Sequence, residues 1–334
     1  MSSIHMTLKQ VNAFAFDLLT ACGASDTSAR SVANSIETAE SDGIRNIGLG
    51  YLPTYLEHLK CQKVDGKAVP KLHDTGAGTF FVDAGQGFAH PAIDKGIPVL
   101  VEKANANGIA AMGIGNSYAC GVLGHLVEPV ARQGLLAMGF ANAPAIIAPW
   151  GGKTPLFGTN PMAVAIPSAS RPPVIIDQAS SKVAKVAIFD RQRAGEPLDE
   201  GWALDKDGRP TIDPEEALNG SMLAIGGYKG TGLAMFVEVM AAALTASNWS
   251  FTAPLFNDNL GGPPKTGQFF VALDPVRFGS EQFLTHIEAL FSAILAQDGT
   301  QLPSDERLVS RERTAQDGIY LDTELYNRLK GYKS

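Results

Sequence analysis

The stretch GIAAMGIGNSYACGVLGHLVEPVARQGLLAMGFAN, residues 108–142, decides the fold class. It opens and closes with the short apolar runs GIAAMGI (108–114) and LLAMGFAN (135–142), which are bounded by glycine and asparagine as buried strands often are. Between these runs, residues 123–133 carry apolar side chains at helical spacing. A strand, a helix and a second strand in this order predict an α/β layered domain.

Runs of the same kind flank this stretch on both sides. Each is short, apolar and bounded mainly by glycine or proline, so we predict a buried strand in each. They are FFVDA (80–84), PMAVAIP (161–167), PVIID (173–177) and GQFFVALD (267–274). Predicted helices alternate with these strands over residues 91–107, between 182 and 198, and over 231–247.

Both ends of the chain have a helical pattern instead. The head has apolar side chains at helical spacing in three segments, which begin at Thr7, at Ser25 or Asp26, and near Leu52 or Pro53. The tail has predicted helices over 280–297, 304–316 and 322–331. A helical head and tail around an α/β centre predict that the two ends pack together. We therefore predict a helical domain built from 1–75 and 276–334, and an α/β domain over 76–275.

The composition argues against several classes of protein. Of 334 residues, 45% are apolar, which is enough for a sizeable core. A net charge of −7 provides no basic face for nucleic acid. No apolar run reaches the roughly 18 residues that span a bilayer, and MSSIHMTLKQ has no secretion-signal pattern. Cys22, Cys61 and Cys120 are scattered without metal-site spacing, so we predict a cytoplasmic protein without a metal.

Glycine-rich loops are the first candidates for a ligand site. There is no Walker sequence, and no G-x-G-x-x-G opens a helix after a strand. GGYKGTGL (226–233) places four glycines and a lysine directly before an apolar helix, where backbone N–H groups and a cation suit a phosphate. The alternative is a flexible helix-entry loop without a ligand. The glycines that follow GIAAMGI are compatible with either a tight loop or a ligand site.

Two histidines stand close to such loops. His90 follows the glycines of GQGFAHPA (85–92) and His125 follows GVLG (121–124), so both are candidates for a site. The other histidines lie in terminal, polar or helix-surface contexts and are interpreted as structural; they are His5, His58, His73 and His286. Asp177 ends an apolar run, where strands present catalytic and cofactor groups, and Lys185 follows eight residues later.

A series of motifs, in order along nearly the whole chain, resembles a known family. The motifs are DGI…G…P-x-Y (42–55), VDGKAVP (64–70), GQGFAHPA (85–92), NSYACGVLG (116–124), PLFGTNP (155–161), IDQAS (176–180), GWALDKDGRPT (201–211), GGYKGTGL (226–233) and TGQFFVALDP (266–275). Together they resemble the malate/L-lactate dehydrogenase-like family. That family includes Δ1-piperideine-2-carboxylate/Δ1-pyrroline-2-carboxylate reductases, ureidoglycolate dehydrogenases and diketogulonate reductases. NSYACGVLG and IDQAS look closer to the ketimine-reductase branch.

This resemblance implies a fold, a cofactor and a set of contacts. The implied fold is a non-Rossmann α/β domain with a mixed, largely antiparallel sheet, in a homodimer with sites near the subunit interface. The implied cofactor is NADPH or NADH. Its contacts would be Ala119, Cys120, Gly121, Val122 and Leu123; Asp177, Gln178 and Ala179; Lys185 and Val186; Gly226 and Gly227; and, closing over it from the tail, Gln301, Pro303, Asp305 and Arg307. Thr159 matches the residue that contacts substrate.

The chain departs from the family where the chemistry is expected. Members typically read Ser-His-Gly followed three residues on by Arg, which supplies a proton-donor histidine and a carboxylate-binding arginine. The same frame here reads Asn46-Ile47-Gly48 and then Tyr51, and it is fixed on both sides, by Asp42-Gly43 and by Pro53. Ile47 cannot transfer a proton.

Several polar residues are candidates to replace the missing groups. Arg45 is the candidate for the carboxylate contact, and we count it with Tyr118 and Thr159 as substrate-binding. Tyr51, Tyr118 and Lys185 are the candidate proton donors. The charge-relay aspartate of some reductases matches Ala187, and Asp190 lies one helical turn on. Our predicted catalytic set is therefore Asn46, Tyr51, Lys185 and Asp190.

The missing histidine also bears on the reaction. Oxidising a 2-hydroxy acid requires a base, and reducing a ketone requires an acid. A cyclic ketimine can enter already protonated as an iminium and then needs only hydride. We therefore predict an NAD(P)H-dependent reductase of Δ1-pyrroline-2-carboxylate or Δ1-piperideine-2-carboxylate. The alternatives are a 2-hydroxy-acid dehydrogenase with a substitute acid/base, and a catalytically silent homologue that binds cofactor or a metabolite.

Overall fold

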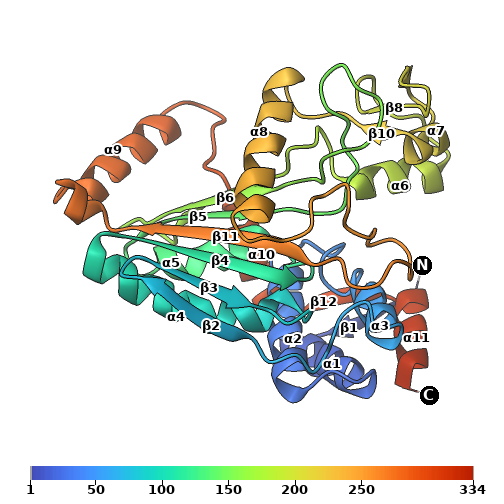
Figure 1. The fold of residues 1–334 in the computed structure, drawn as a ribbon, viewed down its shortest axis with the longest axis horizontal. Helices are drawn as coiled ribbons and strands as arrows, with labels where there is room; N and C mark the ends of the chain where they lie inside the picture. The colour runs from blue at the N-terminus through green and yellow to red at the C-terminus, as the bar shows by residue number, and fades with distance from the viewer. Residues whose placement is uncertain (1, 334) are drawn as a thin grey trace.

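A mixed seven-stranded sheet forms the centre of the molecule in the computed structural model, which describes residues 2–333 (Figure 1). The strand order is β2-β3-β4-β11-β5-β6-β7. The strands span Lys71–Gly76 (β2), Thr79–Asp83 (β3), Ile109–Ser117 (β4), Leu136–Ala141 (β5), Met162–Ile166 (β6), Val174–Gln178 (β7) and Thr266–Leu273 (β11). The predicted α/β class is confirmed.

The strand β11 occupies the middle of this sheet although it is the last of the sheet's seven strands in the sequence. It pairs antiparallel with β4 on one side and with β5 on the other, so that Phe270 is in register with both Met112 and Gly139. Neighbouring strands in this sheet run antiparallel, apart from the parallel pair β3 and β4. A segment far along the chain therefore completes the sheet.

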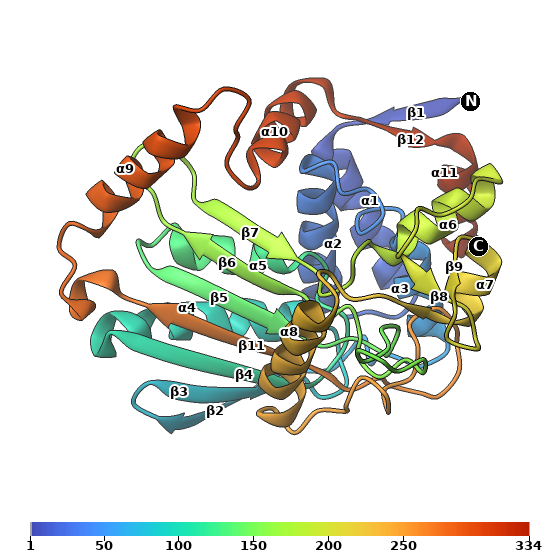
Figure 2. The same cartoon turned by 90° about the horizontal axis from the view of Figure 1, so that it is seen from above.

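Two helices cover one face of the sheet. α4 (Ala89–Asn107) and α5 (Leu123–Ala131) lie beneath the strands in Figure 1 and run alongside them in Figure 2. Their apolar sides bury Leu100 and Val127 in one cluster with Phe270 of the sheet. Gly108 ends α4 with φ of +84°, the left-handed conformation that favours glycine after a helix.

A smaller module stands over the other face. It contains α6 (Lys185–Ala194), α7 (Pro214–Asn219) and a three-stranded sheet of β8 (Ala203–Leu204), β9 (Pro210–Thr211) and β10 (Ser221–Met222). From this module α8 (Tyr228–Glu238) leads back to the large sheet (Figure 1). The helix predicted over 231–247 therefore begins earlier than expected, and it continues as a π-helix over Val239–Ala243.

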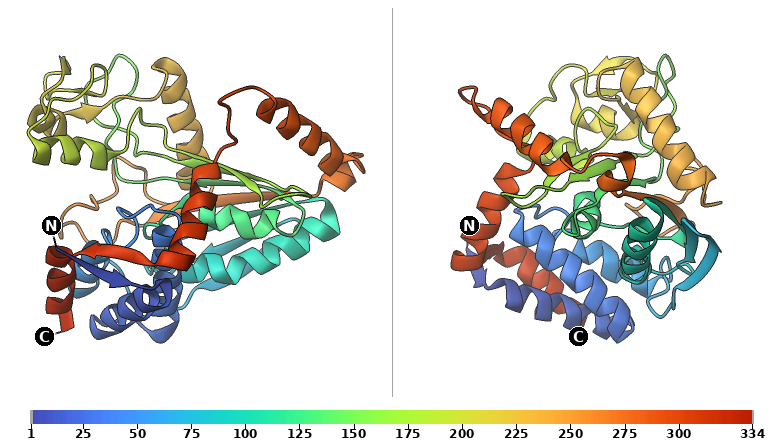
Figure 3. Two further views of the ribbon diagram at one scale, coloured as in Figure 1. Left: turned by 180° about the vertical axis from the view of Figure 1, so that it is seen from behind. Right: turned by 90° about the vertical axis from the view of Figure 1, so that its left-hand side faces the viewer.

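The two ends of the chain pack together under one end of the sheet (Figure 3). The head supplies α1 (Leu8–Ala21), α2 (Asp26–Ser41) and α3 (Leu52–Lys60), and the tail supplies α10 (Asp305–Asp317) and α11 (Thr323–Lys330). Strand β1 (Ser3–Met6) pairs antiparallel with β12 (Ile319–Asp322). Thr7 and Ser25 cap α1 and α2, as their side chains predict. Leu329 of the tail is buried in the cluster that holds Leu18 of the head.

Some elements were not predicted from the sequence. They are β1, β2, β12, α7 and the small three-stranded sheet, all of which are short. β2 crosses residue 75, where the predicted domain boundary lies. The predicted tail helix α9 (Phe283–Leu295) stands apart from the terminal helices, at the far end of the sheet (Figure 3). Within residues 2–333, no helix combines the length and apolar character that crossing a membrane requires.

Candidate active site

The residues that replace the family's catalytic triplet lie in a turn between α2 and α3, which we call the 45–51 turn. Backbone packing holds its shape. The buried carboxylate of Glu40 accepts a hydrogen bond from the N–H of Leu49 at 2.7 Å. A Cβ on Gly48 would collide with this carboxylate, and one on Gly50 would lie 2.7 Å from the carbonyl oxygen of Arg45. Both positions therefore require glycine for close approach.

The candidate residues of this turn face different surroundings. Arg45 and Asn46 are exposed, and the Arg45 guanidinium donates a hydrogen bond to the carbonyl of Tyr320 at 3.4 Å. Ile47 is half-buried and faces the loop predicted to contact the cofactor. A Cβ on Gly121 of that loop would lie 4.0 Å from Ile47 Cγ2. An apolar side chain thus stands against the loop where the family has its histidine.

His90 closes another side of the same spot. The same Cβ on Gly121 would lie 3.2 Å from His90 Nε2 and 3.0 Å from Ser35 Oγ. The His90 side chain is buried, and within residues 2–333 neither of its ring nitrogens has a hydrogen-bond partner. Burial lowers the pKa of His90 to about 4, so the ring is neutral at pH 7. The sequence candidate His90 is therefore an enclosed, neutral imidazole beneath the predicted cofactor loop.

Two predicted proton donors share one aromatic cluster. The ring of Tyr51 packs edge-on against Tyr55 with ring centroids 4.9 Å apart. Tyr118 packs against Tyr55, Phe88 and Phe256 with centroids 5.1–6.0 Å apart. Burial raises the pKa of both phenols. Both hydroxyls therefore keep their protons at neutral pH.

His58 and Lys63 hold this cluster in place. Nδ1 of His58 is hydrogen-bonded to the Tyr118 hydroxyl, and Nε2 lies 2.9 Å from the carbonyl oxygen of Asp258. The fully buried ammonium of Lys63 donates to the carbonyls of Leu255, Asp258 and Leu260 at 2.5–2.8 Å. This fixes the loop at 255–260 next to Tyr118. The helix-surface position predicted for His58 is wrong, because the ring turns into the core where both nitrogens find partners.

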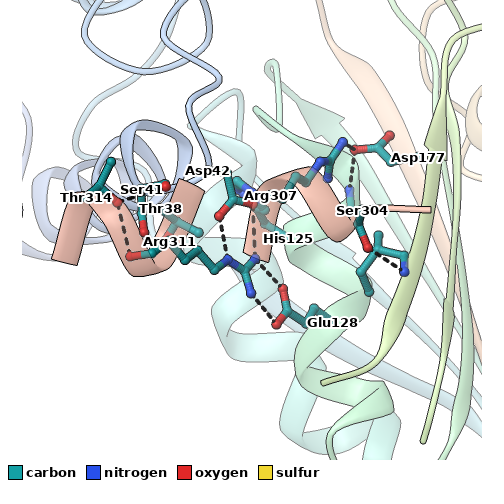
Figure 4. A network of polar contacts seen from close by, with 12 residues as sticks. Thr38, Ser41, Asp42, His125, Glu128, Asp177, Ser304, Arg307, Arg311 and Thr314 are labelled. Carbon is teal, nitrogen blue, oxygen red and sulfur yellow. Dashed lines mark hydrogen bonds and ion pairs between the residues drawn. The ribbon is translucent and has the colours of Figure 1, made fainter. Parts of the chain in front are cut away.

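Three of the segments predicted to bind the cofactor meet at the end of β7. Asp177 Oδ2 accepts a hydrogen bond from the N–H of Gly124 at 3.0 Å and from the Arg307 guanidinium at 3.3 Å (Figure 4). These contacts join the loop at 119–124, the strand end at 177 and the start of α10. Gln301 and Pro303 are exposed beside them, and Asp305 forms an ion pair with Arg171.

Thr159, the predicted substrate contact, is tied to the same edge through its backbone. Its carbonyl accepts a hydrogen bond from the N–H of Ser180 at 2.7 Å, directly after Gln178 and Ala179. The next residue, Asn160, has φ of +38° and is fully buried. Its amide donates to the buried Glu238 carboxylate at 2.6 Å. This network fixes the turn that carries Thr159.

Gly226 and Gly227 line a cavity of about 670 Å³ between the small module and α8. Both glycines have positive φ, and a Cβ on Gly227 would lie 2.8 Å from the Trp150 indole. Lys182 and Thr231 line the same cavity. Its volume is within the range of small-molecule sites, about 300–1,000 Å³. A cavity with glycine backbone, an aromatic ring and one cation suits part of a dinucleotide.

The candidates on α6 are separated from one another. Lys185 lines a cavity of about 170 Å³ together with Ser221 and Asn257, and burial lowers the pKa of its ammonium. Val186 follows Lys185 in the helix and is half-buried. Asp190 is exposed, and its carboxylate forms an ion pair with Arg193. The structure therefore places Lys185 at a cavity and Asp190 on the surface.

His125 belongs to an ion network (Figure 4). Its Nε2 lies 2.9 Å from Asp42 Oδ2, and the Arg311 guanidinium lies 3.0 Å from the same oxygen and 2.7 Å from Glu128 Oε2. Burial alone would raise the pKa of both carboxyls, but hydrogen bonds from His125 and Arg311 lower that of Asp42, and those from Arg311 and Arg132 lower that of Glu128. The network clamps the end of α2, before the 45–51 turn, to α5 and α10.

Comparison with known proteins identifies the family to which this architecture belongs. The sequence pattern of the family described as malate/L-lactate dehydrogenase matches residues 6–330. The chain belongs to this family. Among its members, the (2R)-3-sulfolactate dehydrogenase (NADP(+)) of Chromohalobacter salexigens is 41% identical over 98% of this chain and 97% of its own length. The Δ1-pyrroline-2-carboxylate reductase of Ancylobacter novellus is 37% identical over 98% and 97%.

Solved structures agree with this assignment. The crystal structure of Δ1-piperideine-2-carboxylate reductase from Pseudomonas syringae pvar. tomato matches with a TM-score of 0.94 and 34% identity, over 98% of this chain and 99% of that one. The sulfolactate dehydrogenase from Methanocaldococcus jannaschii matches with a TM-score of 0.90 and 26% identity, over 98% and 96%. As a malate/L-lactate dehydrogenase family member, the chain is an NAD(P)-dependent oxidoreductase.

Some site residues left no distinct signal in the sequence. Lys63 and Glu40 look like ordinary surface charges, because a single charged residue does not reveal whether its partners will bury it. Arg311 lies in the charged run RER (311–313), and nothing in that run distinguishes it from a surface charge. His58 carried one usable signal: it recurs at helical spacing with the buried Tyr55 and Leu59 on α3.

Proposed function

We propose that this enzyme uses NAD(P)H to reduce the C=N bond of a small cyclic ketimine carboxylate. The substrates would be Δ1-pyrroline-2-carboxylate or Δ1-piperideine-2-carboxylate, and the products L-proline or L-pipecolate. The observation that carries this proposal is the apolar side chain of Ile47 against the loop at Gly121. A substrate that arrives with its own proton fits a site with no acid at this position.

Proton demand separates the possible substrates. In a protonated ketimine the carbon already bears enough positive character to accept hydride, and the nitrogen needs no further proton. A 2-oxo acid gains a negative oxygen as hydride arrives and requires a donor, which typically contributes 10²- to 10⁴-fold to the rate. The cost of losing a histidine at position 47 is therefore greater for an oxo acid than for an iminium. Relatives named as pyrroline-2-carboxylate reductases support this choice.

A 2-hydroxy-acid dehydrogenase is the second candidate. A relative with 41% identity bears the name of a sulfolactate dehydrogenase. The half-buried Tyr51 in the 45–51 turn also offers a hydroxyl that is protonated at neutral pH. In this second function Tyr51 would donate to, or accept from, the substrate oxygen, and Arg45 and Thr159 would contact the carboxylate end of the substrate.

The cofactor we propose is NADPH or NADH, which supplies the hydride. Residues 119–123, Asp177 to Ala179, and Arg307 would hold it along the end of β7, where the Asp177 carboxylate contacts both Gly124 and Arg307. The cavity at Gly226 and Gly227 would take another part of it. The name of the Chromohalobacter relative favours NADP over NAD.

We also propose that the protein is a cytoplasmic homodimer. Exposed apolar side chains lie on α8, the π-helix and α9, among them Met235, Phe236, Val239, Leu284 and Leu290. Apolar groups concentrated on a few helices are typical of a surface that another subunit covers. Within the described residues all three cysteines are free, which is compatible with a reducing compartment.

A substrate panel tests the function. Purified protein is mixed with NADPH or NADH and with cyclic imines and 2-oxo acids, and the nicotinamide absorbance is followed. Turnover of imines alone supports the ketimine reductase, and turnover of oxo acids supports the dehydrogenase. Cofactor binding without turnover on any substrate supports a catalytically silent homologue and contradicts both enzymatic proposals.

Restoring the family motif sharpens this test. In the double variant Ile47→His, Tyr51→Arg we expect 2-oxo-acid turnover to rise by about 100-fold, since a general acid and a carboxylate contact are regained. Cyclic-imine turnover should change less. If activity of any kind appears only in the double variant, the native chain is not a reductase of this type.

A further inference from the structure

The cavity at the start of α6 contains a cation and a hydroxyl that the protein itself leaves without partners. This cavity of about 170 Å³ is lined by Lys185, the first residue of α6, by Ser221 of β10 and by Asn257 of the loop at 255–260. The other lining residues are apolar, and among all the lining residues that the structure describes none is acidic. Apolar walls with a few polar groups are typical of sites for small molecules.

The ammonium group of Lys185 has no counter-ion. Lys185 is half-buried, and burial lowers the pKa of its ammonium without a contribution from any charged neighbour in residues 2–333. Over the same residues the ammonium forms no ion pair, and its Nζ lies 5.9 Å from the centroid of the Phe189 ring. No side chain caps the N-terminus of α6, and its first turn holds no acidic residue. A half-buried cation at an uncapped helix N-terminus favours an anion.

Ser221 provides a second, independent observation. It is 2% exposed, and within the described part of the chain its hydroxyl has no hydrogen-bond partner. Native proteins seldom leave a buried hydroxyl unpaired, because this costs about 1–3 kcal/mol. An anionic oxygen in the cavity would accept a hydrogen bond from this hydroxyl, and Lys185 would neutralise its charge.

Two walls of the cavity continue into the predicted substrate side of the site. Phe256, which lies between two lining residues of the loop at 255–260, packs its ring on Tyr118 with centroids 5.1 Å apart. Pro155, another lining residue, begins the segment PLFGTNP that carries Thr159. Arg45, the carboxylate contact predicted from the sequence, is exposed and donates to a backbone carbonyl instead. The cavity therefore offers an alternative position for the acidic end of the substrate.

We propose that this cavity binds the carboxylate of the substrate, with Lys185 as its counter-ion and Ser221 as a hydrogen-bond donor. This inference rests on the proposed function and deepens it, because Lys185 takes over the role of the arginine that Tyr51 replaces. A cyclic ketimine carboxylate and a 2-hydroxy acid both carry a carboxylate next to the reacting carbon. The apolar walls fit the ring of a cyclic imino acid, whereas about 170 Å³ is too small for a dinucleotide. Lys185 then contacts substrate as a cation and is not its proton donor.

A binding test uses pyrrole-2-carboxylate, a planar cyclic acid that resembles the proposed imine and whose aromatic ring resists reduction. Titration calorimetry of the full-length protein measures its Kd. We expect Lys185→Met to raise this Kd about 30-fold and Ser221→Ala about 5-fold, since the first removes a charged contact and the second a single hydroxyl. Lys206→Met, at an exposed lysine of the same module, is the matched control and should leave the Kd unchanged. The uncharged pyrrole-2-carboxamide should bind weakly and equally to all of these proteins. Unchanged affinity for the acid in Lys185→Met, or no binding to the unmodified protein, would overturn the inference.

Stability separates a ligand site from a structural role. Ser221→Ala removes an unpartnered hydroxyl, and Lys185→Met removes an uncompensated charge but keeps the apolar stem of the side chain. Neither change takes a polar contact away from the ligand-free protein, so the melting temperature should stay the same or rise in both. A melting temperature that falls in both variants, relative to Lys206→Met, would mark structural groups and contradict a ligand site.

Turnover then assigns the bound acid to the substrate. With the imine or oxo acid that is turned over, Lys185→Met should raise KM about 30-fold and leave kcat nearly unchanged, because the carboxylate contact is the same in the ground and transition states. Pyrrole-2-carboxylate should compete with that substrate. A fall in kcat at constant KM would make Lys185 the proton donor, non-competitive inhibition would place the acid outside the substrate site, and a weaker Kd for NADPH would assign Lys185 to the cofactor. Each of these results overturns the inference. Absence of turnover in the unmodified protein contradicts the proposed function instead, and calorimetry still decides whether the cavity binds the acid.

Discussion

The 45–51 turn and the proposed cofactor side of the site each depend on a carboxylate that accepts a backbone N–H, but the two carboxylates differ in their role. In the turn, Leu49 donates to Glu40, which lies on α2 outside the predicted catalytic set, and the glycines at 48 and 50 permit close approach. On the cofactor side, Asp177 joins the N–H of Gly124 to the Arg307 guanidinium and is itself a predicted cofactor contact. The first region can change its predicted catalytic side chains and keep these contacts. The second loses both contacts when Asp177 is replaced.

This difference explains how the catalytic motif can change while the fold remains. The contacts of Glu40, Gly48 and Gly50 use no side chain of Asn46, Ile47 or Tyr51, although the Tyr51 ring also packs on Tyr55. Substitution at these three positions therefore leaves the contacts of Glu40 and the glycines intact, and the match to solved relatives persists with a TM-score of 0.94. In the 45–51 turn, the predicted catalytic residues differ from the residues whose contacts hold the turn. On the cofactor side, Asp177 has both roles.

The largest expected effect comes from breaking the clamp that joins both regions. Arg311→Ala leaves the fully buried Asp42 with His125 alone and deprives Glu128 of one partner. We expect the free energy of unfolding to fall by about 3 kcal/mol, the low end for a broken buried ion pair, because Arg311 is itself partly exposed. Urea unfolding measures it, with the exposed Arg193→Ala as control. Equal stability of the two variants would mean that the clamp contributes little.

The next effect isolates the cofactor side. Asp177→Ala removes the acceptor of both Gly124 and Arg307, and we expect the Kd of NADPH to rise about 30-fold, or about 2 kcal/mol, as for a charged hydrogen bond. Titration calorimetry measures the change, and Asp190→Ala on exposed α6 is the control. Unchanged affinity in Asp177→Ala would remove this carboxylate from the cofactor site.

A smaller effect isolates the 45–51 turn. Gly48→Ala places a methyl group against the buried Glu40 carboxylate, so we expect a loss of about 1.5 kcal/mol in the free energy of unfolding. Gly232→Ala, on an exposed stretch of α8 with no atom near the added methyl, should be neutral or stabilising. NADPH affinity should be unaffected in both. A turn variant that loses cofactor affinity would show that the two regions are not independent.

The smallest effect is a pH dependence of the clamp. The pKa values of Asp42 and Glu128 are lower in the folded protein than in the unfolded chain, where carboxyl groups titrate near about 4. Their contribution to stability is therefore present above that pH and is lost as the pH falls through their folded values. The melting temperature should drop below about pH 4, and less steeply in Arg311→Ala. Identical slopes would contradict the assignment of the clamp.

Much of the architecture follows from local sequence pattern. The runs at 108–114, 135–142, 161–167, 173–177 and 267–274 all became strands, because each is a compact apolar segment between turn residues. Caps at Thr7 and Ser25 placed α1 and α2. The pairing of β11 with β4 and β5 has no local signature, since it joins segments far apart in the chain. The strands β1 and β12 have four residues each and are too short to be distinguished from loop.

The site follows from sequence only where a motif is contiguous. Ile47 and Tyr51 were locatable because glycines and prolines framed them, and the structure does place Ile47 beside Gly121. His58 and Lys63 were not, because their importance arises from partners about 60 and 200 residues away. His125 is a candidate by its position after a glycine loop, but its partner is Asp42, which also pairs with Arg311 of α10. Residues that act through distant partners remain hidden in a linear pattern.

The central place of β11 governs the order in which a ribosome can produce a finished molecule. Strands β4 and β5 leave the exit tunnel early, yet the edge of each that faces β11 stays unpaired until residue 273 has been synthesised. The helices at the head wait longer still, because β1 has its pairing partner in β12 and Leu329 fills their core. Nascent chains must therefore keep unpaired strand edges from one another through most of translation. A protein with this strand order should fold slowly and be sensitive to truncation at its carboxyl end.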